Sequence, residues 1–260
     1  MDQTPNTINQ KPEPKGLSLP VAIVLAAVII GLALIVIRAP RTASQPTADT
    51  SIDITSLLQG VLASKAKLAI APVTAKDHIR GATTPSVTIV EYSDLECPYC
   101  QRFHMTMEKV LENYGDKVAW VYRHYPLDCV DNTDSDCTPL HPKARNEAIA
   151  SECAAAQGGN DAFWKFIDEI FAITPANNRL DPKELTATAQ KIGLNTQTFD
   201  SCVANKTYAD VVSSDAKGGL AIGVQGTPLS IAIDKDGNTY KIEGAYPYEV
   251  VSALIEKIAK

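Results

Sequence analysis

Apolar side chains along the chain follow two periodicities, which together predict an α/β fold. Residues 87–90 and 118–123 are short runs rich in β-branched and apolar side chains, which is typical of buried strands. Residues 101–114 instead carry apolar side chains three, four and seven positions apart, which predicts an amphipathic helix that ends at Gly115. The folded part therefore begins with a strand, a helix and a second strand.

A helical region is predicted after an irregular segment at 125–142. Its expected helices lie at 144–156, 161–171, 181–193, 197–203 and 208–222. The chain then closes with two strands, at 229–233 and 239–242, and a helix at 247–259. The folded part thus starts with a strand–helix–strand unit and ends with a hairpin–helix unit, and helices separate the two. This order is typical of a thioredoxin-type fold.

The longest apolar run lies near the N-terminus, at 16–37, and carries no charged side chain. As a helix it would span about 33 Å, enough to cross a bilayer. We interpret it as an uncleaved transmembrane signal-anchor, because the apolar core of a cleaved signal peptide is usually only ~7–15 residues long. Residues 1–15 are then a cytoplasmic tail, 38–71 a linker or spacer, and 72–260 the folded domain. Within the linker, 52–71 is either a short helix packed on the domain or a spacer.

Composition and charge limit which cellular compartment and which binding partners are expected. The 260-residue chain has a formal net charge of −6 and no basic cluster, which argues against nucleic acid as a partner. All six cysteines follow the apolar run, an arrangement that indicates an oxidising compartment. Positive residues flank the run almost equally, so the cysteines decide the orientation. We expect a single-pass protein of the cytoplasmic (inner) membrane with its C-terminal domain in the periplasm.

Cys97 and Cys100 are separated by two residues at the expected start of the first helix. Free backbone N–H groups and the helix dipole stabilise a thiolate at that end, which favours Cys97 as the exposed nucleophile. Cys100, one turn further along, would be the resolving partner in thiol–disulfide exchange through a mixed disulfide. This chemistry needs no cofactor other than the Cys97–Cys100 disulfide itself.

A metal site is the alternative for this cysteine pair. Zinc at a structural site takes four ligands, often from two such pairs, and the chain holds no second pair. His104 would add one ligand from the next helical turn, and no fourth is evident. Asp131, Asp134 and Asp136 lack the glycine and the distal glutamate of a calcium-binding EF-hand loop. We therefore predict no metal site, and keep a tethered metallochaperone or adhesion module as an alternative function.

Residues from about 78 to 260 resemble the DsbA-like branch of the thioredoxin superfamily, in its membrane-tethered or secreted bacterial type. The matching stretches are 87–94, 97–100 (Cys-Pro-Tyr-Cys), 121–127 and 223–228. The resemblance implies a thioredoxin fold with a helical domain, at about 143–222 here, inserted after the first strand–helix–strand unit. Glutaredoxins share the Cys-Pro-Tyr-Cys stretch, but they are much shorter and cytosolic, so the anchor and the helical region argue against that family.

The same resemblance implies how substrate is bound. It predicts that the Thr227–Pro228 peptide bond is cis, faces the active site and offers backbone hydrogen bonds to a substrate strand beside Cys97. From sequence alone this bond is only a turn candidate, because cis occurs in about 5–6% of X–Pro bonds. Pro98 and Tyr99, between the two cysteines, are expected to contact substrate as well.

Two carboxylates near the cysteines are expected to have opposite roles. Glu91 matches the buried acid of DsbA-like proteins that helps to move a proton for the second cysteine, Cys100. Burial would raise the pKa of Glu91 towards neutrality. Glu96 directly precedes Cys97, and a carboxylate there opposes formation of the thiolate, so Glu96 is expected to restrain oxidising power.

The other four cysteines are expected to form structural disulfides. Cys129 and Cys137 flank an acidic stretch of the irregular segment, while Cys153 and Cys202 lie on two expected helices. We predict the pairs Cys129–Cys137 and Cys153–Cys202, because the members of each pair share a local environment; two packed apolar thiols are the alternative for the second pair. The histidines are interpreted as structural or surface residues, although His124 could border the active site.

These observations predict a membrane-anchored protein disulfide oxidoreductase that oxidises unfolded or reduced cysteine-containing proteins outside the cytoplasmic membrane. A membrane-bound or soluble redox partner would reset its disulfide, and the N-terminal helix would contact the lipid bilayer. A disulfide reductase or isomerase of the same fold is the nearest alternative, because sequence alone does not fix the direction of exchange.

Overall fold

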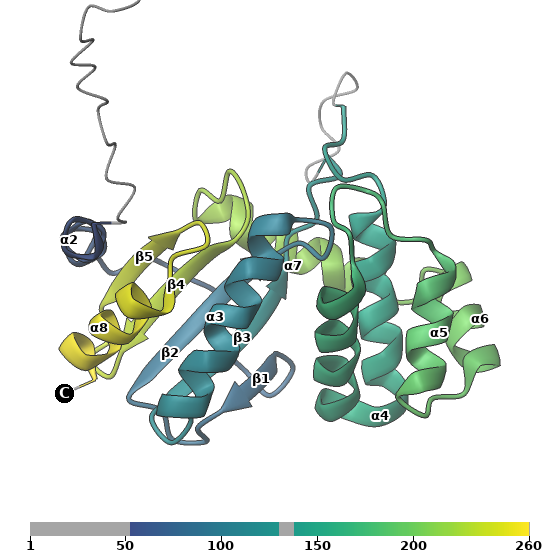
Figure 1. Ribbon diagram of the computed structural model, residues 1–260, viewed down its shortest axis with the longest axis horizontal. Helices are drawn as coiled ribbons and strands as arrows, with labels where there is room; N and C mark the ends of the chain where they lie inside the picture. Colours follow the sequence, from purple (N-terminus) through teal and green to yellow (C-terminus); the bar gives the residue numbers. More distant parts are fainter. Residues whose placement is uncertain (1–52, 130–137, 260) are drawn as a thin grey trace, which may run out of the picture. The chain divides into compact units, whose positions relative to one another are not determined.

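The computed structural model describes residues 53–129 and 138–259 (Figure 1). The expected tail at 1–15 and the expected anchor at 16–37 lie outside the described residues. Within the part of the chain that is described, no helix combines the length and the apolarity needed to cross a membrane.

A five-stranded mixed sheet in the order β1-β3-β2-β4-β5 forms the centre of the domain. Its strands are β1 (His78–Gly81), β2 (Val87–Ser93), β3 (Val118–His124), β4 (Leu229–Asp234) and β5 (Thr239–Glu243). Because β2 pairs in parallel with β3 and antiparallel with β4, the strand that leads to Cys97 is the central one. The sheet and its helices form a thioredoxin-like α/β fold.

Helices cover both faces of the sheet, and β2 contributes to an apolar core on each side. On one face, Val87 and Ile89 pack with α3 (Pro98–Tyr114) and α8 (Tyr248–Ile258). On the other face, Val90 and Tyr92 pack with α7 (Ala209–Ala221) (Figure 1). Two buried faces explain why residues 87–90 are an almost continuous apolar run and do not alternate with polar residues.

Near the edges of the sheet lie one strand that the apolar pattern does not predict and one helix that is only one of two possibilities from sequence. The short strand β1 mixes polar and apolar residues, and it pairs antiparallel with β3. On its outer edge, the Asn160 side chain accepts from the N–H of Ile79 (3.1 Å) and donates to its C=O (2.7 Å), so these backbone groups are not left open to another strand. At the other end, α2 (Ile54–Ala63) packs against α8 and β5, so part of the linker is a helix on the domain.

The helical region between β3 and β4 consists of α4 (Ala144–Ile173), α5 (Lys183–Lys191) and α6 (Thr196–Ala204), followed by α7. Sequence predicted two helices where α4 stands, and the structure joins them across a kink at Gly158 and Gly159, whose backbone angles are not helical. Aromatic side chains of α4 connect this region to the sheet, because Phe163 and Trp164 pack against Tyr122 of β3.

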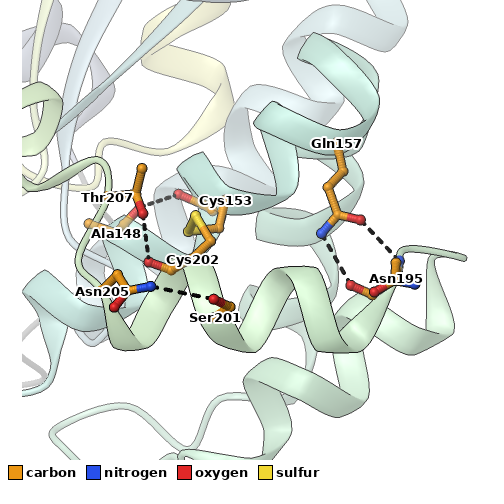
Figure 2. Close-up of a disulfide and its surroundings, with 9 residues drawn as sticks. Ala148, Cys153, Gln157, Asn195, Ser201, Cys202, Asn205 and Thr207 are labelled. Carbon is orange, nitrogen blue, oxygen red and sulfur yellow. Dashed lines mark hydrogen bonds between the residues drawn. A yellow bond between two sulfur atoms is a disulfide. The ribbon is translucent and has the colours of Figure 1, made fainter.

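A disulfide joins α4 to α6 through Cys153 and Cys202 (Figure 2). Beside it, the Gln157 side chain accepts from the N–H of Asn195 (3.0 Å) and donates to its C=O (3.3 Å). These contacts hold the two helices together at two points. The other predicted disulfide, Cys129–Cys137, stays a prediction, because Cys137 lies outside the described residues.

Candidate active site

The two cysteines lie where the central strand ends and α3 begins. Cys97 is the N-cap of α3, and its extended backbone precedes Pro98 at the first helical position, where a missing N–H costs nothing. Cys97 is buried with 4% of its surface exposed, and Cys100 has no exposed surface; both are free thiols. Only Cys97 lines a surface pocket, which has a volume of about 510 Å³. The geometry therefore presents one thiol of the pair to a binding partner.

The pKa values of the two thiols shift in opposite directions. A hydrogen bond from the Cys100 thiol contributes most to lowering the pKa of Cys97 to about 6, and it outweighs the opposing effect of burial. Thr227, which lies against Cys97 Sγ, and backbone N–H groups at the start of α3 also lower this pKa. Burial, together with the neighbouring Cys97, raises the pKa of Cys100 well above its ordinary value. At neutral pH, Cys97 is therefore mainly a thiolate and Cys100 a thiol.

The loop before β4 meets Cys97 from the opposite side. Thr227–Pro228 is a cis peptide bond, and the carbonyl oxygen of Thr227 lies 3.4 Å from Cys97 Sγ. Thr227 lines the pocket beside Cys97, whereas Pro228 lines an adjoining hollow of about 440 Å³. The Tyr125 hydroxyl donates to the C=O of Val224 (2.7 Å) and so holds the start of this loop against the end of β3.

The residues between the cysteines form the rim of the same pocket. Pro98 and Tyr99 both line it, and the Tyr99 side chain is 55% exposed, an unusual position for a large aromatic ring. Leu140, which lines the same pocket, is 67% exposed. The pocket beside Cys97 therefore offers exposed apolar surface.

Glu91 lies on β2, buried behind the cysteine pair. Burial raises its pKa to about 7, although hydrogen bonds with Ser93 and Trp120 oppose the shift. Trp120 Nε1 donates to Glu91 Oε2 at 2.9 Å. The charge of Glu91 is in turn one of the causes that raise the pKa of Cys100. A carboxyl group that titrates near neutrality thus interacts with the thiol that must gain and lose a proton.

His141 is a site residue that sequence analysis missed. Its ring lines the pocket beside Cys97, and Nδ1 is hydrogen-bonded to Asp94 Oδ2 at 2.8 Å. Burial opposes the charged ring, but the hydrogen bond and charge of Asp94 raise the pKa of His141. His124, which sequence singled out, does not line this pocket and instead contacts Glu152 Oε1 at 3.0 Å. No spacing signal marks His141, because a long irregular segment separates it from the cysteines.

His104, the possible third metal ligand, has another partner. Its Nε2 is hydrogen-bonded to Asp168 Oδ1 at 2.8 Å. Glu108 completes a group whose ligand atoms lie close together, but Arg80 also donates to Asp168, at 2.6 Å. A guanidinium on the same carboxylate disfavours a cation there. Among the described residues, no candidate metal group contains Cys97 or Cys100.

A family model described as Thioredoxin matches residues 73–257. The chain belongs to the thioredoxin family. Among solved structures, it is similar to DsbA2 of Pseudomonas aeruginosa, with 28% identity and a TM-score of 0.55 over 72% of this chain and 95% of that one. BdbD of Bacillus subtilis shares the fold, with 22% identity and a TM-score of 0.59 over 75% of this chain and 99% of that one. Within the thioredoxin superfamily, the chain is of the DsbA type of thiol–disulfide oxidoreductases.

The curated relatives are longer proteins. A Na⁺/H⁺ antiporter NhaA 3 of Salinispora tropica is 32% identical over 180 residues, which are 69% of this chain and 24% of that protein. The chain thus spans about a quarter of the length of the curated relatives it matches.

Membership of the DsbA type agrees with the geometry of the site. The chain has the fold of the thioredoxin superfamily, with a helical region inserted between β3 and β4. Its Cys-Pro-Tyr-Cys stretch begins α3, and its cis-Pro loop lies against the first cysteine.

Proposed function

We propose that this DsbA-type protein oxidises cysteine pairs of unfolded or reduced proteins outside the cytoplasmic membrane, with Cys97–Cys100 as its redox-active disulfide. The observation that carries the proposal is the position of Cys97 as the N-cap of α3, with the Cys100 thiol and backbone N–H groups around its sulfur, which lowers its pKa to about 6. A stabilised thiolate favours the reduced form of the pair, and a pair whose reduced form is favoured is a strong oxidant.

The proposed reaction transfers two electrons from the substrate to the disulfide. A substrate thiolate attacks Cys97 Sγ, the Cys97–Cys100 bond breaks, and its electron pair goes to Cys100, which takes up a proton. The second substrate thiolate attacks the substrate sulfur of this mixed disulfide and releases Cys97 as a thiolate. Substrate leaves with a new disulfide, and a redox partner, membrane-bound or soluble, later accepts the two electrons and restores Cys97–Cys100.

Glu91 is the group that we propose supplies and accepts the proton of Cys100. Its pKa of about 7 lets it exist in both forms near neutral pH, and its charge acts on Cys100. A carboxyl with an ordinary pKa would be ionised throughout this range and would hold no proton to give.

The groove around Cys97 is the proposed binding site for the substrate chain. The backbone of Thr227, before the cis-proline Pro228, offers hydrogen bonds to an extended segment, and Pro98 and Tyr99 contact its side chains. The 55% exposure of the Tyr99 ring supports this role, because a large aromatic surface beside a nucleophile favours a partner with apolar side chains.

The proposed location is the cytoplasmic (inner) membrane, with a single-pass anchor at 16–37 in the bilayer and the domain on the periplasmic side. Two features of the chain support it: the uncharged apolar run and a structural disulfide between Cys153 and Cys202, a bond that persists in oxidising compartments. The net charge of −6 gives no reason to expect nucleic acid as a partner.

Two alternatives make different predictions. A reductase or isomerase would use the same site, but its Cys97–Cys100 pair would have a lower redox potential than that of an oxidase. A tethered metal-binding module would need ligands beyond the two cysteines, and His104, the one that sequence offers, is hydrogen-bonded to Asp168. The described residues therefore support exchange chemistry better than metal binding.

The test is oxidation of a reduced model protein by the full chain. Cys97→Ser should abolish it. In Cys100→Ala, the Cys97 thiolate should instead attack the disulfide of an oxidised model protein and form a mixed disulfide that Cys100 no longer resolves, so the complex should accumulate on a gel. If Cys97→Ser oxidised the substrate as fast as the wild type, the proposal would be wrong. Stoichiometric zinc in the purified wild type, lost in both variants, would instead support the metal-binding alternative.

A further inference from the structure

Two buried carboxyl groups meet beside the cysteine pair. Glu96, which directly precedes Cys97, has no exposed surface, and Glu147, in the first turn of α4, is 3% exposed. Asp94 accepts from the backbone N–H of Glu96 (2.8 Å) and is hydrogen-bonded to His141 (2.8 Å), just before α4, so the segments that carry the two carboxyl groups are held together. The two side chains interact directly there. Two ionised carboxylates offer only acceptor oxygens, so such a contact needs a proton between them.

The hydrogen bonds around the pair leave a place for that proton. Glu96 Oε2 accepts from the backbone N–H of Asn178. Glu96 Oε1 and Glu147 Oε2 are buried, and neither meets an N–H or O–H donor among the described residues. A buried acceptor without a donor is costly, and one shared proton satisfies both carboxyl groups.

The charged neighbours favour Glu147 as the residue that keeps the proton. Asp94 carries a negative charge close by, although His141 is paired with it at 2.8 Å. Lys143 is the neighbouring cation that opposes protonation of Glu147, and its Nζ already donates to the C=O of Leu180. Burial, and then the contact with Glu96, raises the pKa of Glu147 to about 10.

We propose that Glu147 is a positioning residue that holds one proton and donates it to Glu96, so that the pair carries a single negative charge and fixes the segment before Cys97. Glu147 does not touch the reacting sulfur and acts through Glu96. The assignment deepens the proposed function, because it concerns how the same site is held and charged.

The contacts of Glu96 show what the shared proton would hold in place. Its backbone C=O accepts from the N–H of Asn177 at 2.8 Å, next to the contact of Asn178 with its carboxylate. Residues 176–178 all have positive φ, and Asn178 also donates from its side chain to the C=O of Leu140 (2.9 Å). Glu96 thus connects the segment before Cys97 to the start of α4 and to the turn after α4.

The first experiment detects the proton directly, in the full chain with ¹³C-labelled glutamate side chains. One buried carboxyl carbon should still show the protonated state at pH 8, where Glu91, with its pKa of about 7, is mostly ionised. That signal should vanish in Glu147→Gln and persist in Glu91→Gln, the matched control. If every carboxyl signal were ionised at pH 8, the proposal would be overturned.

The second experiment detects the bound proton from the pH dependence of the unfolding equilibrium. An acid whose pKa is raised in the folded state binds a proton that the unfolded chain has lost, so stability falls as pH rises between the two pKa values. The unfolding equilibrium constant of the wild type, divided by that of Glu147→Gln, should therefore rise about tenfold per pH unit between about pH 5 and 9. Parallel pH profiles of the two proteins would contradict a shared proton.

The third experiment follows the charge that Cys97 experiences. Glu147→Gln replaces a protonated carboxyl with a neutral amide donor, so the negative charge of Glu96 remains and the thiolate-to-thiol ratio of Cys97 should stay unchanged. Glu96→Gln removes that charge, because burial keeps Glu147 protonated, and the ratio should then rise by about three- to tenfold. An equal rise in both single variants would mean that both carboxyl groups are ionised and would contradict the proposal. None of these measurements needs turnover, so negative results would not contradict the proposed oxidoreductase function. Full activity in Cys97→Ser would contradict that function and would leave the shared proton untouched.

Discussion

At the scale of single residues, the site separates two chemically identical thiols by their surroundings. Cys97 accepts hydrogen bonds above all from Cys100, and also from backbone N–H groups at the start of α3. Cys100 has no exposed surface and lies among negative charges, which keep its proton in place. The helix-terminus argument from sequence favours Cys97 as the nucleophile, and the structure adds that the Cys100 thiol makes the largest contribution to lowering the pKa of Cys97.

The first prediction concerns that hydrogen bond. Cys100→Ala removes the donor and should raise the pKa of Cys97 from about 6 towards its ordinary value. Cys100→Ser keeps an O–H donor at the same position and should raise the pKa less. The pH dependence of thiolate absorbance, or of the alkylation rate of Cys97, measures both. Equal pKa values in the wild type and Cys100→Ala would contradict this account of the thiolate.

The second prediction concerns Glu91, whose folded-state pKa of about 7 lies above its ordinary value of 4.5. Because the folded protein holds a proton that the unfolded chain loses, stability decreases as pH rises from about 4.5 to 7. Glu91→Gln should therefore raise the free energy of unfolding at pH 8, by an amount on the order of 3 kcal/mol, and change it little at pH 4. Urea unfolding at the two pH values tests this, and a variant that is less stable at pH 8 would contradict it.

Residues close to the cysteines in sequence could be predicted, and residues that only the fold brings close could not. Glu91, Pro98 and Tyr99 lie beside Cys97 and Cys100 along one strand and one helix, so local pattern and resemblance located them. Partners from the helical region carry no such signal. Sequence analysis expected Glu96 by itself to restrain Cys97, whereas the structure shows a second carboxyl, Glu147, against it.

At the scale of elements, the contact of α7 with the sheet depends on the absence of a side chain. A Cβ at Gly219 would lie 2.6 Å from a ring carbon of Tyr125 and 3.0 Å from one of Tyr92. The neighbouring Gly218 has room, since its Cβ would come no closer than 3.6 Å to the Tyr92 hydroxyl. Sequence predicted this helix but not which of its glycines touches the sheet, because that depends on how the helix is rotated about its axis.

The third prediction compares these two glycines. Gly219→Ala should destabilise the domain by about 1–3 kcal/mol, because two buried rings or the helix itself must shift. Gly218→Ala, one residue earlier in the same helix, should be neutral or stabilising by up to about 1 kcal/mol, because alanine is the better helix former. Thermal unfolding of both variants measures the difference, and equal melting temperatures would mean that α7 does not pack as closely as described.

The fourth prediction concerns the disulfide between α4 and α6. The two cysteines are 49 residues apart, and a bond across that length should stabilise the folded state by about 4 kcal/mol in the chain-entropy model. The double variant Cys153→Ala with Cys202→Ala should lose stability of that order while the pKa of Cys97 stays unchanged. Denaturant unfolding and thiol titration of the same sample test both parts. Unchanged stability would make these cysteines dispensable packing residues.

At the scale of the whole molecule, the order of elements was predictable and two edges of the sheet were not. Long amphipathic helices and fully buried strands have strong periodic patterns, so α3, α8, β2 and β3 were found close to their observed bounds. The four residues of β1 are too few and too mixed to show a pattern, and pairing with β3 makes them a strand. For residues 52–71, sequence did not decide between a packed helix and a spacer. The helix α2 is short, and its contacts with α8 and β5 depend on the fold.

The central claim is that the surroundings of Cys97 make its disulfide with Cys100 an oxidant. The direct measurement is the reduction potential of this pair in the full chain, obtained by equilibration with glutathione buffers, alkylation and mass spectrometry. We predict a value well above the roughly −270 mV of thioredoxin, towards the roughly −120 mV of DsbA. A value close to that of thioredoxin would contradict the claim and would indicate a reductase.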